Sequence, residues 1–295
     1  MNLIETKNLT KKYGQHIAVN QLNIKISAGK LTGYLGTNGA GKSTTIQMLT
    51  KTLTPSSGEI VYSNHKQRIA MGVVFQNSVL DNELTVFDNL ILRGKMYQTI
   101  EKKTIISLMK KTGVFLFAKK KYGQLSGGMR RKVDITRALI NQPDILFLDE
   151  PTTGLDPQSR KEIWELLNEL KQNGLGIFLT THYLEEAEFA DYIYILEKGK
   201  IVEEGSAYQL KKKYEQPVVH LLSNQMDILE RELKNYHTNK NSEDSIDVYL
   251  ENKQEVISLL QRIEGLILDF SYQPIGMNEV FLKVTGKEIG YESIM

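Results

Sequence analysis

The sequence has no cysteine, a single tryptophan, six prolines and no long apolar run. Without cysteine, the chain forms neither a disulfide framework nor a zinc–thiolate site. No segment approaches the roughly 18 apolar residues that a membrane-spanning helix requires. The first residues also lack the apolar core of a signal peptide. We therefore expect a cytoplasmic protein.

An excess of charge of one sign is also lacking, since 37 basic and 35 acidic side chains give a net charge of +2. Residues 1–210 carry 27 basic and 21 acidic side chains, and residues 211–295 carry 10 and 14. Nucleic-acid-binding domains are usually strongly basic, so no nucleic-acid partner is expected. The 41% hydrophobic content of the 295 residues is sufficient for a globular core.

A glycine-rich string that begins at Gly36 fits the phosphate-binding pattern G-x-x-x-x-G-K-[ST]. It lies between an apolar run, Leu31–Leu35, and a predicted helix, Lys42–Leu53. Glycines allow backbone N–H groups to turn toward a polyanion, Lys42 supplies a cation, and Ser43 supplies a hydroxyl for Mg²⁺. By itself this pattern indicates only a nucleotide phosphate, and together with the motifs below the expected cofactors are ATP and Mg²⁺. The predicted ATP-binding residues here are Gly36, Thr37, Asn38, Gly39, Ala40, Gly41, Lys42, Ser43 and Thr44.

A second glycine-containing string follows about ninety residues later and consists of Leu125, Ser126, Gly127, Gly128 and Met129. Ser-Gly-Gly at the start of a predicted helix forms another anion site. One ATP does not need two such sites in the same chain. The simplest interpretation is that two chains share each ATP.

These two strings and five further motifs resemble, in order, those of an ATP-binding subunit of an ABC transporter. The resemblance covers roughly residues 3–210. The further motifs are Tyr13 near the start, Gln76 in Val-Val-Phe-Gln, Asp149-Glu150 after an apolar run, Gly154-Leu155-Asp156, and Thr180-Thr181-His182. Met129 departs from the commonest signature, which has glutamine there, but the phosphate contacts are expected from Ser126 and two backbone N–H groups.

The resemblance implies a role for each motif. Tyr13 would stack on adenine, and Gln76 would be the Q-loop glutamine, a catalytic and metal-contacting residue. Asp149 would hold Mg²⁺ together with Ser43 and Gln76, and Glu150 would polarise the attacking water. Asp156 would be the D-loop aspartate. His182 would sense the γ-phosphate and align with Glu150, and the signature from Leu125 to Met129 would act in trans.

Alternating strand and helix patterns predict an α/β fold with a mostly parallel core sheet, and the resemblance implies that this is the fold of a P-loop ABC ATPase. Antiparallel strands are expected at the N-terminus, at Leu3–Leu9 and Ile17–Ile26. A helical subdomain carrying the signature helix is expected at about residues 77–142. We place the ATPase domain at residues 1–215.

A small α+β domain is predicted for residues 216–295. Its elements include a helix over Met226–Tyr236 and a polar loop over His237–Asp244. The domain holds no nucleotide motif, so we assign it accessory, dimerisation or regulatory roles. Its ending, Val280–Lys287, resembles the close of drug-resistance-type exporter ATPases, which serve a separate permease.

The leading hypothesis is an ATPase that forms a head-to-tail ATP-sandwich dimer and drives export through a membrane permease, peripheral on the cytoplasmic face of the membrane. The alternative is a non-transport ABC-type ATPase acting on nucleic acid or ribosomes. Long heptad insertions and a second cassette, typical of those classes, are absent from the sequence. Glu150 and His182 oppose a hydrolysis-dead regulator, and Ser126-Gly127-Gly128 disfavours a kinase or GTPase.

Overall fold

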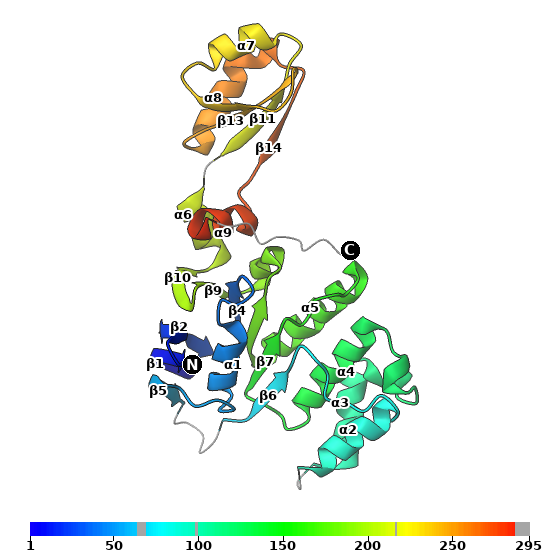
Figure 1. Cartoon of the computed structure of the whole chain (residues 1–295). Coiled ribbons are helices and arrows are strands. Elements are labelled where there is room, and N and C mark those ends of the chain that lie inside the picture. Colours follow the sequence, from blue (N-terminus) through cyan, green and yellow to red (C-terminus); the bar gives the residue numbers. More distant parts are fainter. Residues whose placement is uncertain (64–68, 98–99, 216, 287–295) are drawn as a thin grey trace. The chain divides into compact units, whose positions relative to one another are not determined.

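The computed structural model describes residues 1–63, 69–97, 100–215 and 217–286. These fall into two compact units, Met1–Ser206 and Ala207–Met295 (Figure 1). The second unit begins with α6 (Ala207–Tyr214), which packs against α9 (Met277–Thr285). Within these ranges no helix combines the length and the apolarity needed to cross a membrane.

The first unit is built on a six-stranded sheet in the order β10-β9-β4-β8-β7-β6. The strands are β4 (Leu31–Gly36), β6 (Met71–Val74), β7 (Ile145–Asp149), β8 (Gly176–Thr181), β9 (Tyr192–Glu197) and β10 (Lys200–Gly205). All neighbours are parallel except β10 with β9. Every residue of β4 and β8 is buried, as expected for central strands covered on both faces. The predicted α/β class with a mostly parallel core sheet is confirmed.

An antiparallel sheet precedes this core and is also as predicted. It contains β1 (Asn2–Tyr13), β2 (His16–Leu22), β3 (Lys25–Ser27) and β5 (Ser57–Tyr62), and β1 pairs with the other three. The single strand predicted over Ile17–Ile26 is wrong, because β2 and β3 pair with different stretches of β1.

The predicted helical region is confirmed. Its helices are α2 (Val86–Lys95), α3 (Lys102–Lys111) and α4 (Gly127–Leu139), and two 3₁₀ turns, Val114–Phe117 and Tyr122–Gln124, lie between α3 and α4. Their apolar faces meet in one cluster that includes Leu90, Met109 and Val133, each fully buried. Helix α4 also contacts β6 and α5 (Pro157–Gln172), which brings the signature helix against the core sheet. Helix α1 (Lys42–Leu49) ends four residues before its predicted end.

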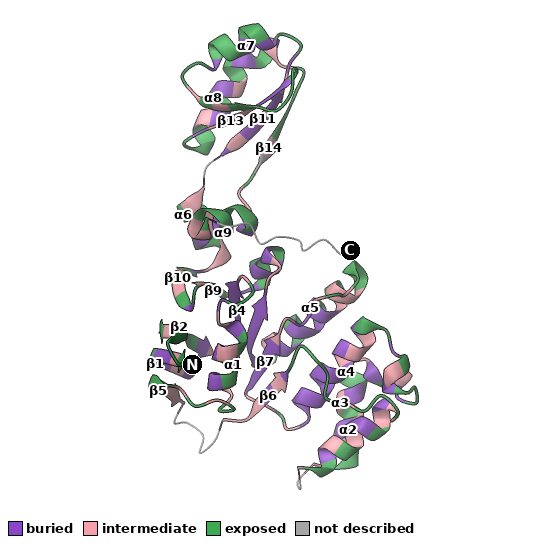
Figure 2. Cartoon of the chain, in the orientation of Figure 1, coloured by how far each residue is buried: buried purple, intermediate pink, exposed green. Residues whose placement is uncertain are grey.

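Between α6 and α9, the second unit has the order strand–helix–strand–strand–helix–strand that is typical of a ferredoxin-like fold. Its elements are β11 (Val218–Leu222), α7 (Met226–Glu232), β12 (His237–Lys240), β13 (Ser245–Tyr249), α8 (Lys253–Ile263), a 3₁₀ turn at Glu264–Leu266 and β14 (Asp269–Gln273). The antiparallel sheet has the order β12-β13-β11-β14, and buried residues gather between it and α7 and α8 (Figure 2).

The polar loop predicted over His237–Asp244 is partly wrong, because its first four residues form β12. This strand lies at the sheet edge and pairs through its backbone with β13, and its His237 ring packs against the Tyr249 ring of β13. An edge strand with an exposed surface needs no apolar side chains, so its sequence carries no strand pattern.

Candidate functional site

The glycine-rich loop connects the carboxyl end of β4 to the first turn of α1. Gly39 and Gly41 adopt positive φ angles of 79° and 102°. A Cβ at Gly41 would lie 2.5 Å from the carbonyl oxygen of Ala18, so only glycine fits there. The sequence therefore produces a tight loop whose backbone amides precede a helix N-terminus, the arrangement that binds phosphate.

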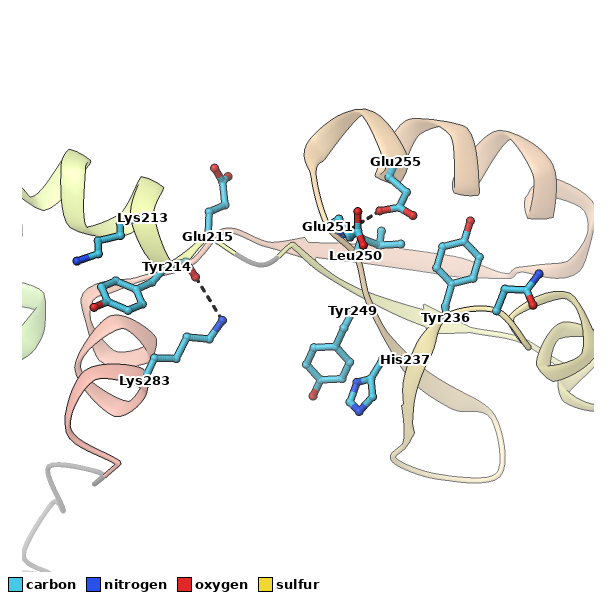
Figure 3. Close-up of a pocket in the computed structure, with 11 residues that line it drawn as sticks. Lys213, Tyr214, Glu215, Tyr236, His237, Tyr249, Leu250, Glu251, Glu255 and Lys283 are labelled. Atoms are coloured by element: carbon cyan, nitrogen blue, oxygen red, sulfur yellow. Dashed lines mark hydrogen bonds between the residues drawn. The ribbon is translucent and has the colours of Figure 1, made fainter.

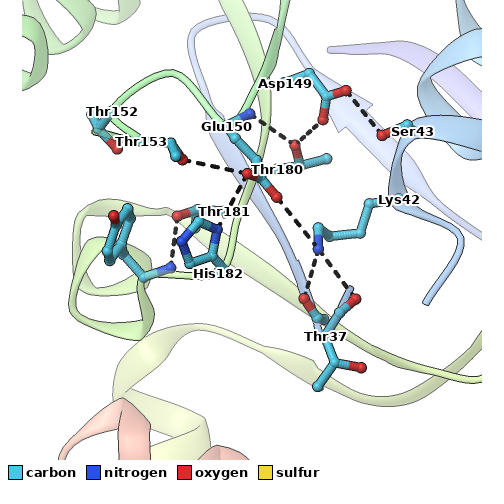
Figure 4. A network of polar contacts seen from close by, with 12 residues as sticks. Thr37, Lys42, Ser43, Asp149, Glu150, Thr152, Thr153, Thr180, Thr181 and His182 are labelled. Atoms are coloured by element: carbon cyan, nitrogen blue, oxygen red, sulfur yellow. Dashed lines mark hydrogen bonds and ion pairs between the residues drawn. The ribbon is translucent and has the colours of Figure 1, made fainter. Parts of the chain in front are cut away.

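Lys42 lies inside this loop and is 6% exposed. Its Nζ donates hydrogen bonds to the carbonyl oxygens of Gly36 and Thr37, at 2.7 and 3.3 Å (Figure 4). Burial lowers the pKa of Lys42, while the negative charges of Glu150 and Asp149 oppose that shift. A partly desolvated cation of this kind gains stabilisation when a phosphate group approaches it.

Asp149 lies at the end of β7, beside the loop. Its Oδ2 accepts a hydrogen bond of 3.0 Å from Ser43 Oγ, and its Oδ1 accepts one of 2.5 Å from Thr180 Oγ1. The carboxyl ends of β4, β7 and β8 meet at one edge of the parallel sheet, which explains why residues so distant in sequence come together. A carboxylate and a hydroxyl are the hard oxygen ligands that Mg²⁺ prefers, so this pair fits the expected metal.

Glu150 follows Asp149 with φ of 47°, in the left-handed region that residues with a Cβ seldom occupy. Its backbone N–H donates to the carbonyl and the hydroxyl of Thr180, both at 3.1 Å. Its Oε1 lies 3.7 Å from Lys42 Nζ, and its Oε2 lies 3.3 Å from His182 Nδ1. Thr153 Oγ1 also donates to Oε2, at 3.3 Å. The unusual backbone conformation therefore aims the carboxylate between the lysine and the histidine.

The neighbours of Glu150 control its charge. Contact with His182 lowers the pKa of Glu150 against the opposing effect of burial, and the charge of Lys42 lowers it further. The contact between His182 and Glu150 lacks hydrogen-bond geometry, so the buried Nδ1 has no hydrogen-bond partner in the described part of the chain. An ionised carboxylate beside a histidine with unused hydrogen-bonding capacity can orient a water molecule or a phosphate oxygen.

Two other predicted residues are exposed, and neither takes part in the contacts of this cluster in the described part of the chain. Tyr13 ends β1 with 49% of its surface exposed, and Lys11 Nζ lies 5.4 Å from the centre of its ring. Gln76 lies exposed just beyond β6, which pairs in parallel with β7. Both side chains are accessible to solvent.

The signature string lies at the start of α4. Ser126 is the N-cap residue, and its Oγ accepts a 3.4 Å hydrogen bond from the Met129 N–H. Ser126 and Gly127 are exposed, whereas Leu125 is buried in the helical cluster. An exposed helix N-terminus with a serine cap and a glycine is open to an anion from outside the chain.

Sequence reasoning missed structural roles within these motifs. A Cβ on Gly128 would lie 2.2 Å from Ser159 Oγ, so close packing between α4 and α5 also requires glycine there. Asp156 is the N-cap of α5 and accepts a 2.9 Å bond from the Ser159 N–H. Thr180, which binds both Asp149 and the backbone of Glu150, was not assigned either, although it belongs to a quoted motif.

A cavity of about 630 Å³ lies in the second unit and not at this cluster (Figure 3). Its lining includes Lys213 and Lys283 as well as Glu215 and Glu251. Side chains of both signs line the same space, so no ligand charge is selected and we assign it no chemistry.

Comparisons with known proteins place this phosphate-binding arrangement within a known family. The ABC transporter family profile matches residues 19–153. A Nod factor export ATP-binding protein I from Cupriavidus pinatubonensis is 33% identical, over 97% of this chain and 92% of its own length. Its counterpart from Rhizobium johnstonii is 36% identical, over 97% and 96%.

Solved structures of ATP-binding cassettes are similar to about 70% of this chain. A nucleotide-free ATP-binding cassette from an ABC transporter has a TM-score of 0.64 at 26% identity, covering 70% of this chain and 92% of its own. A dimeric cassette in a post-hydrolysis state, bound to ADP and phosphate, has a TM-score of 0.61 at 29% identity, covering 69% and 98%. The chain belongs to the family of ABC transporter ATP-binding proteins, whose cassettes bind nucleotide and hydrolyse ATP.

Proposed function

We propose that this chain binds ATP with Mg²⁺, hydrolyses it, and thereby energises export through a separate membrane permease. The observation that carries the proposal is the position of the Glu150 carboxylate, between Lys42 and His182 and next to Asp149. Export is supported by relatives that are named export ATP-binding proteins and that align over nearly the whole chain. Since the pathway lies in another polypeptide, the cargo is not assigned.

The residues of the cluster divide the chemistry among them. Lys42 and the loop amides bind the phosphates, and Tyr13 stacks on the base. Ser43, Asp149 and Gln76 would hold Mg²⁺, and the ion would neutralise phosphate charge when bound. Glu150 accepts a hydrogen bond from the attacking water and orients it.

His182 is proposed to hold the γ-phosphate beside Glu150. Its Nδ1 already lies 3.3 Å from the carboxylate, so a proton on that nitrogen would keep Glu150 ionised. Asp156 holds the start of α5 and so fixes the loop that follows Glu150.

We further propose that a second copy completes each ATP site with its signature residues. The exposed Ser126 cap and Gly127 at the start of α4 support this, as does the similarity to a dimeric cassette. The permease-bound dimer would lie on the cytoplasmic face of the membrane. The ATPase domain would end before residue 216, and the following ferredoxin-like domain would dimerise or regulate the chain.

The decisive experiment compares Glu150→Gln with Glu185→Gln, a matched change at an exposed glutamate. Glu150→Gln should keep ATP binding but slow turnover by about two to four orders of magnitude, as loss of a general base does. With ATP it should sediment as a dimer, and adding Ser126→Arg should abolish that dimer. Near-normal hydrolysis by Glu150→Gln would contradict the assigned base, and a dimer of unchanged affinity with Ser126→Arg would contradict the shared site.

A further inference from the structure

Helix α4, which begins at the signature, carries a buried arginine that reaches two loops of the core. Arg131 is 8% exposed. Its Nη1 donates to the Phe75 carbonyl at 2.9 Å, and its Nη2 donates to the Glu150 carbonyl at 3.3 Å. Phe75 directly precedes Gln76. A single rigid guanidinium plane therefore joins the backbone before Gln76 to the backbone of Glu150.

The same helix also holds the chain after Gln76. Asp134 lies three residues beyond Arg131 on α4, on the same helix face. Its Oδ1 accepts a 2.6 Å hydrogen bond from Ser78 Oγ, and its Oδ2 accepts a 3.1 Å bond from the Tyr122 hydroxyl. Gln76 thus lies between Phe75 and Ser78, both of which are bonded to the signature helix.

Glu150 needs such support because its φ of 47° is unfavourable for a residue with a Cβ. Thr180 holds its N–H group, and its carbonyl oxygen accepts bonds from Arg131 at 3.3 Å and from the Thr153 N–H at 3.4 Å. If Arg131 is lost, the Glu150 carbonyl keeps only the longer bond from the Thr153 N–H in the described part of the chain. We then expect the Glu150 backbone to relax toward an ordinary conformation and the carboxylate to leave its place between Lys42 and His182.

We infer that Arg131 is a positioning residue that links the Gln76 loop and the signature helix to the carboxylate of Glu150. The inference rests on the proposed role of Glu150 as the group that orients water. Its consequence is mechanical: a displacement of the Gln76 loop or of α4 moves the catalytic glutamate. The Gln76 loop, the signature helix α4 and Glu150 are thereby connected within one chain.

The chain offers a matched control on the same helix. Arg137 is 7% exposed, and its Nη2 donates to the Val73 carbonyl at 2.6 Å. It is therefore as buried as Arg131 and also bonds a carbonyl of the β6 segment, but its side-chain bonds in the described part of the chain do not reach Glu150. Replacing either arginine disturbs the α4–β6 contact, and only one replacement disturbs Glu150.

The test compares Arg131→Lys with Arg137→Lys. A lysine ammonium is a point donor that cannot span two carbonyls as the guanidinium does. Both variants should lose a similar amount of thermal stability. Only Arg131→Lys should lower kcat, by about 10- to 100-fold as expected for a misplaced catalytic group, while KM and the ATP dissociation constant stay within about twofold. An equal fall in kcat for both variants would overturn the inference.

A double-mutant cycle separates positioning from general damage. If Arg131 acts through the Glu150 carboxylate, Arg131→Lys should cause no further loss in single-turnover rate when Glu150→Gln is already present. The same loss factor in both backgrounds would refute the inference. Failure of the proposed function has a different signature, because Glu150→Gln would then hydrolyse ATP at a near-normal rate.

Ser78 provides a second test on an exposed loop, where substitution does not threaten the core. Ser78→Ala removes the bond to Asp134 and should lower kcat severalfold at unchanged KM, and Ser78→Thr should restore it because the hydroxyl is retained. A wild-type kcat in Ser78→Ala, or no rescue by threonine, would count against the inference even if Arg131→Lys did not fold.

Discussion

The buried carboxylate of Glu186 is expected to contribute several kcal/mol to the stability of the first unit. Glu186 lies in the 3₁₀ segment Leu184–Phe189 and is only 2% exposed. Its carboxylate accepts hydrogen bonds from Thr152 Oγ1, from Thr181 Oγ1 at 2.8 Å and from Trp164 Nε1 at 3.4 Å. These donors come from the loop after Glu150, the end of β8 and α5, so one buried carboxylate holds three segments together.

The magnitude follows from the groups that would lose their acceptor. Glu186→Ala leaves the hydroxyls of Thr152 and Thr181, which are 0% and 1% exposed, without this partner. Each buried donor left unsatisfied costs about 1–3 kcal/mol, so with the indole N–H we expect a loss of about 3–5 kcal/mol. For a unit of this size, unfolding should begin roughly 10 °C lower. Glu186→Gln retains one carbonyl acceptor and should lose only about 1–2 kcal/mol.

The assay uses the single tryptophan of the chain. Trp164 is 8% exposed, and its ring stacks on Phe189 with centroids 4.9 Å apart. Selective excitation therefore reports unfolding at the site of the substitution. Glu185→Gln, at an exposed neighbour, is the control and should unfold like wild type. A Glu186→Ala protein that unfolds within about 2 °C of wild type would show that the carboxylate does not hold these segments.

Three further predictions concern the nucleotide site and the second unit. Lys42→Ala should lose ATP binding, because it removes the buried cation of the phosphate loop. Isothermal titration calorimetry measures this, and a variant that still binds ATP with wild-type affinity would contradict the prediction. Because its neighbours hold the pKa of Glu150 below the ordinary value of 4.5, the stability advantage of wild type over Glu150→Gln should be complete above about pH 4.5. It should shrink as the pH falls through the folded-state pKa, and in denaturant titrations an advantage that grows on acidification would oppose the argument. Truncation after Ser206 should leave ATP binding largely unchanged but weaken nucleotide-free self-association measured by sedimentation, because it removes a tether; a folded truncation that cannot bind ATP would place this unit in the site.

Much of the first unit could be predicted because its signals are local. A buried parallel strand is an apolar run, and a phosphate loop requires glycines at fixed spacing before a lysine. Leu31–Leu35 and Gly36–Ser43 contain both signals side by side. The order of the motifs then placed Asp149, Glu150 and His182 at strand ends, where parallel strands bring their carboxyl ends together.

Strand boundaries were less predictable in both units, at places where pairing with a neighbouring backbone decides which residues form a strand. His237–Lys240 has no apolar alternation, and it becomes a strand only because β13 offers free hydrogen-bonding groups beside it. In the same way, Ile17–Ile26 looks like one strand, and its division depends on which part of β1 each half meets.

The sequence by itself determined the fold class, the nucleotide loop and the identity of the acidic and histidine groups, because these depend on short spacings and strand periodicity. Only the tertiary structure decided which side chains hold them in place. Arg131 reaches Phe75 across 56 positions, and Glu186 reaches Thr152 across 34. Such buried contacts follow from the packing of α4, α5 and the sheet, and packing over those separations leaves no periodic trace in the chain.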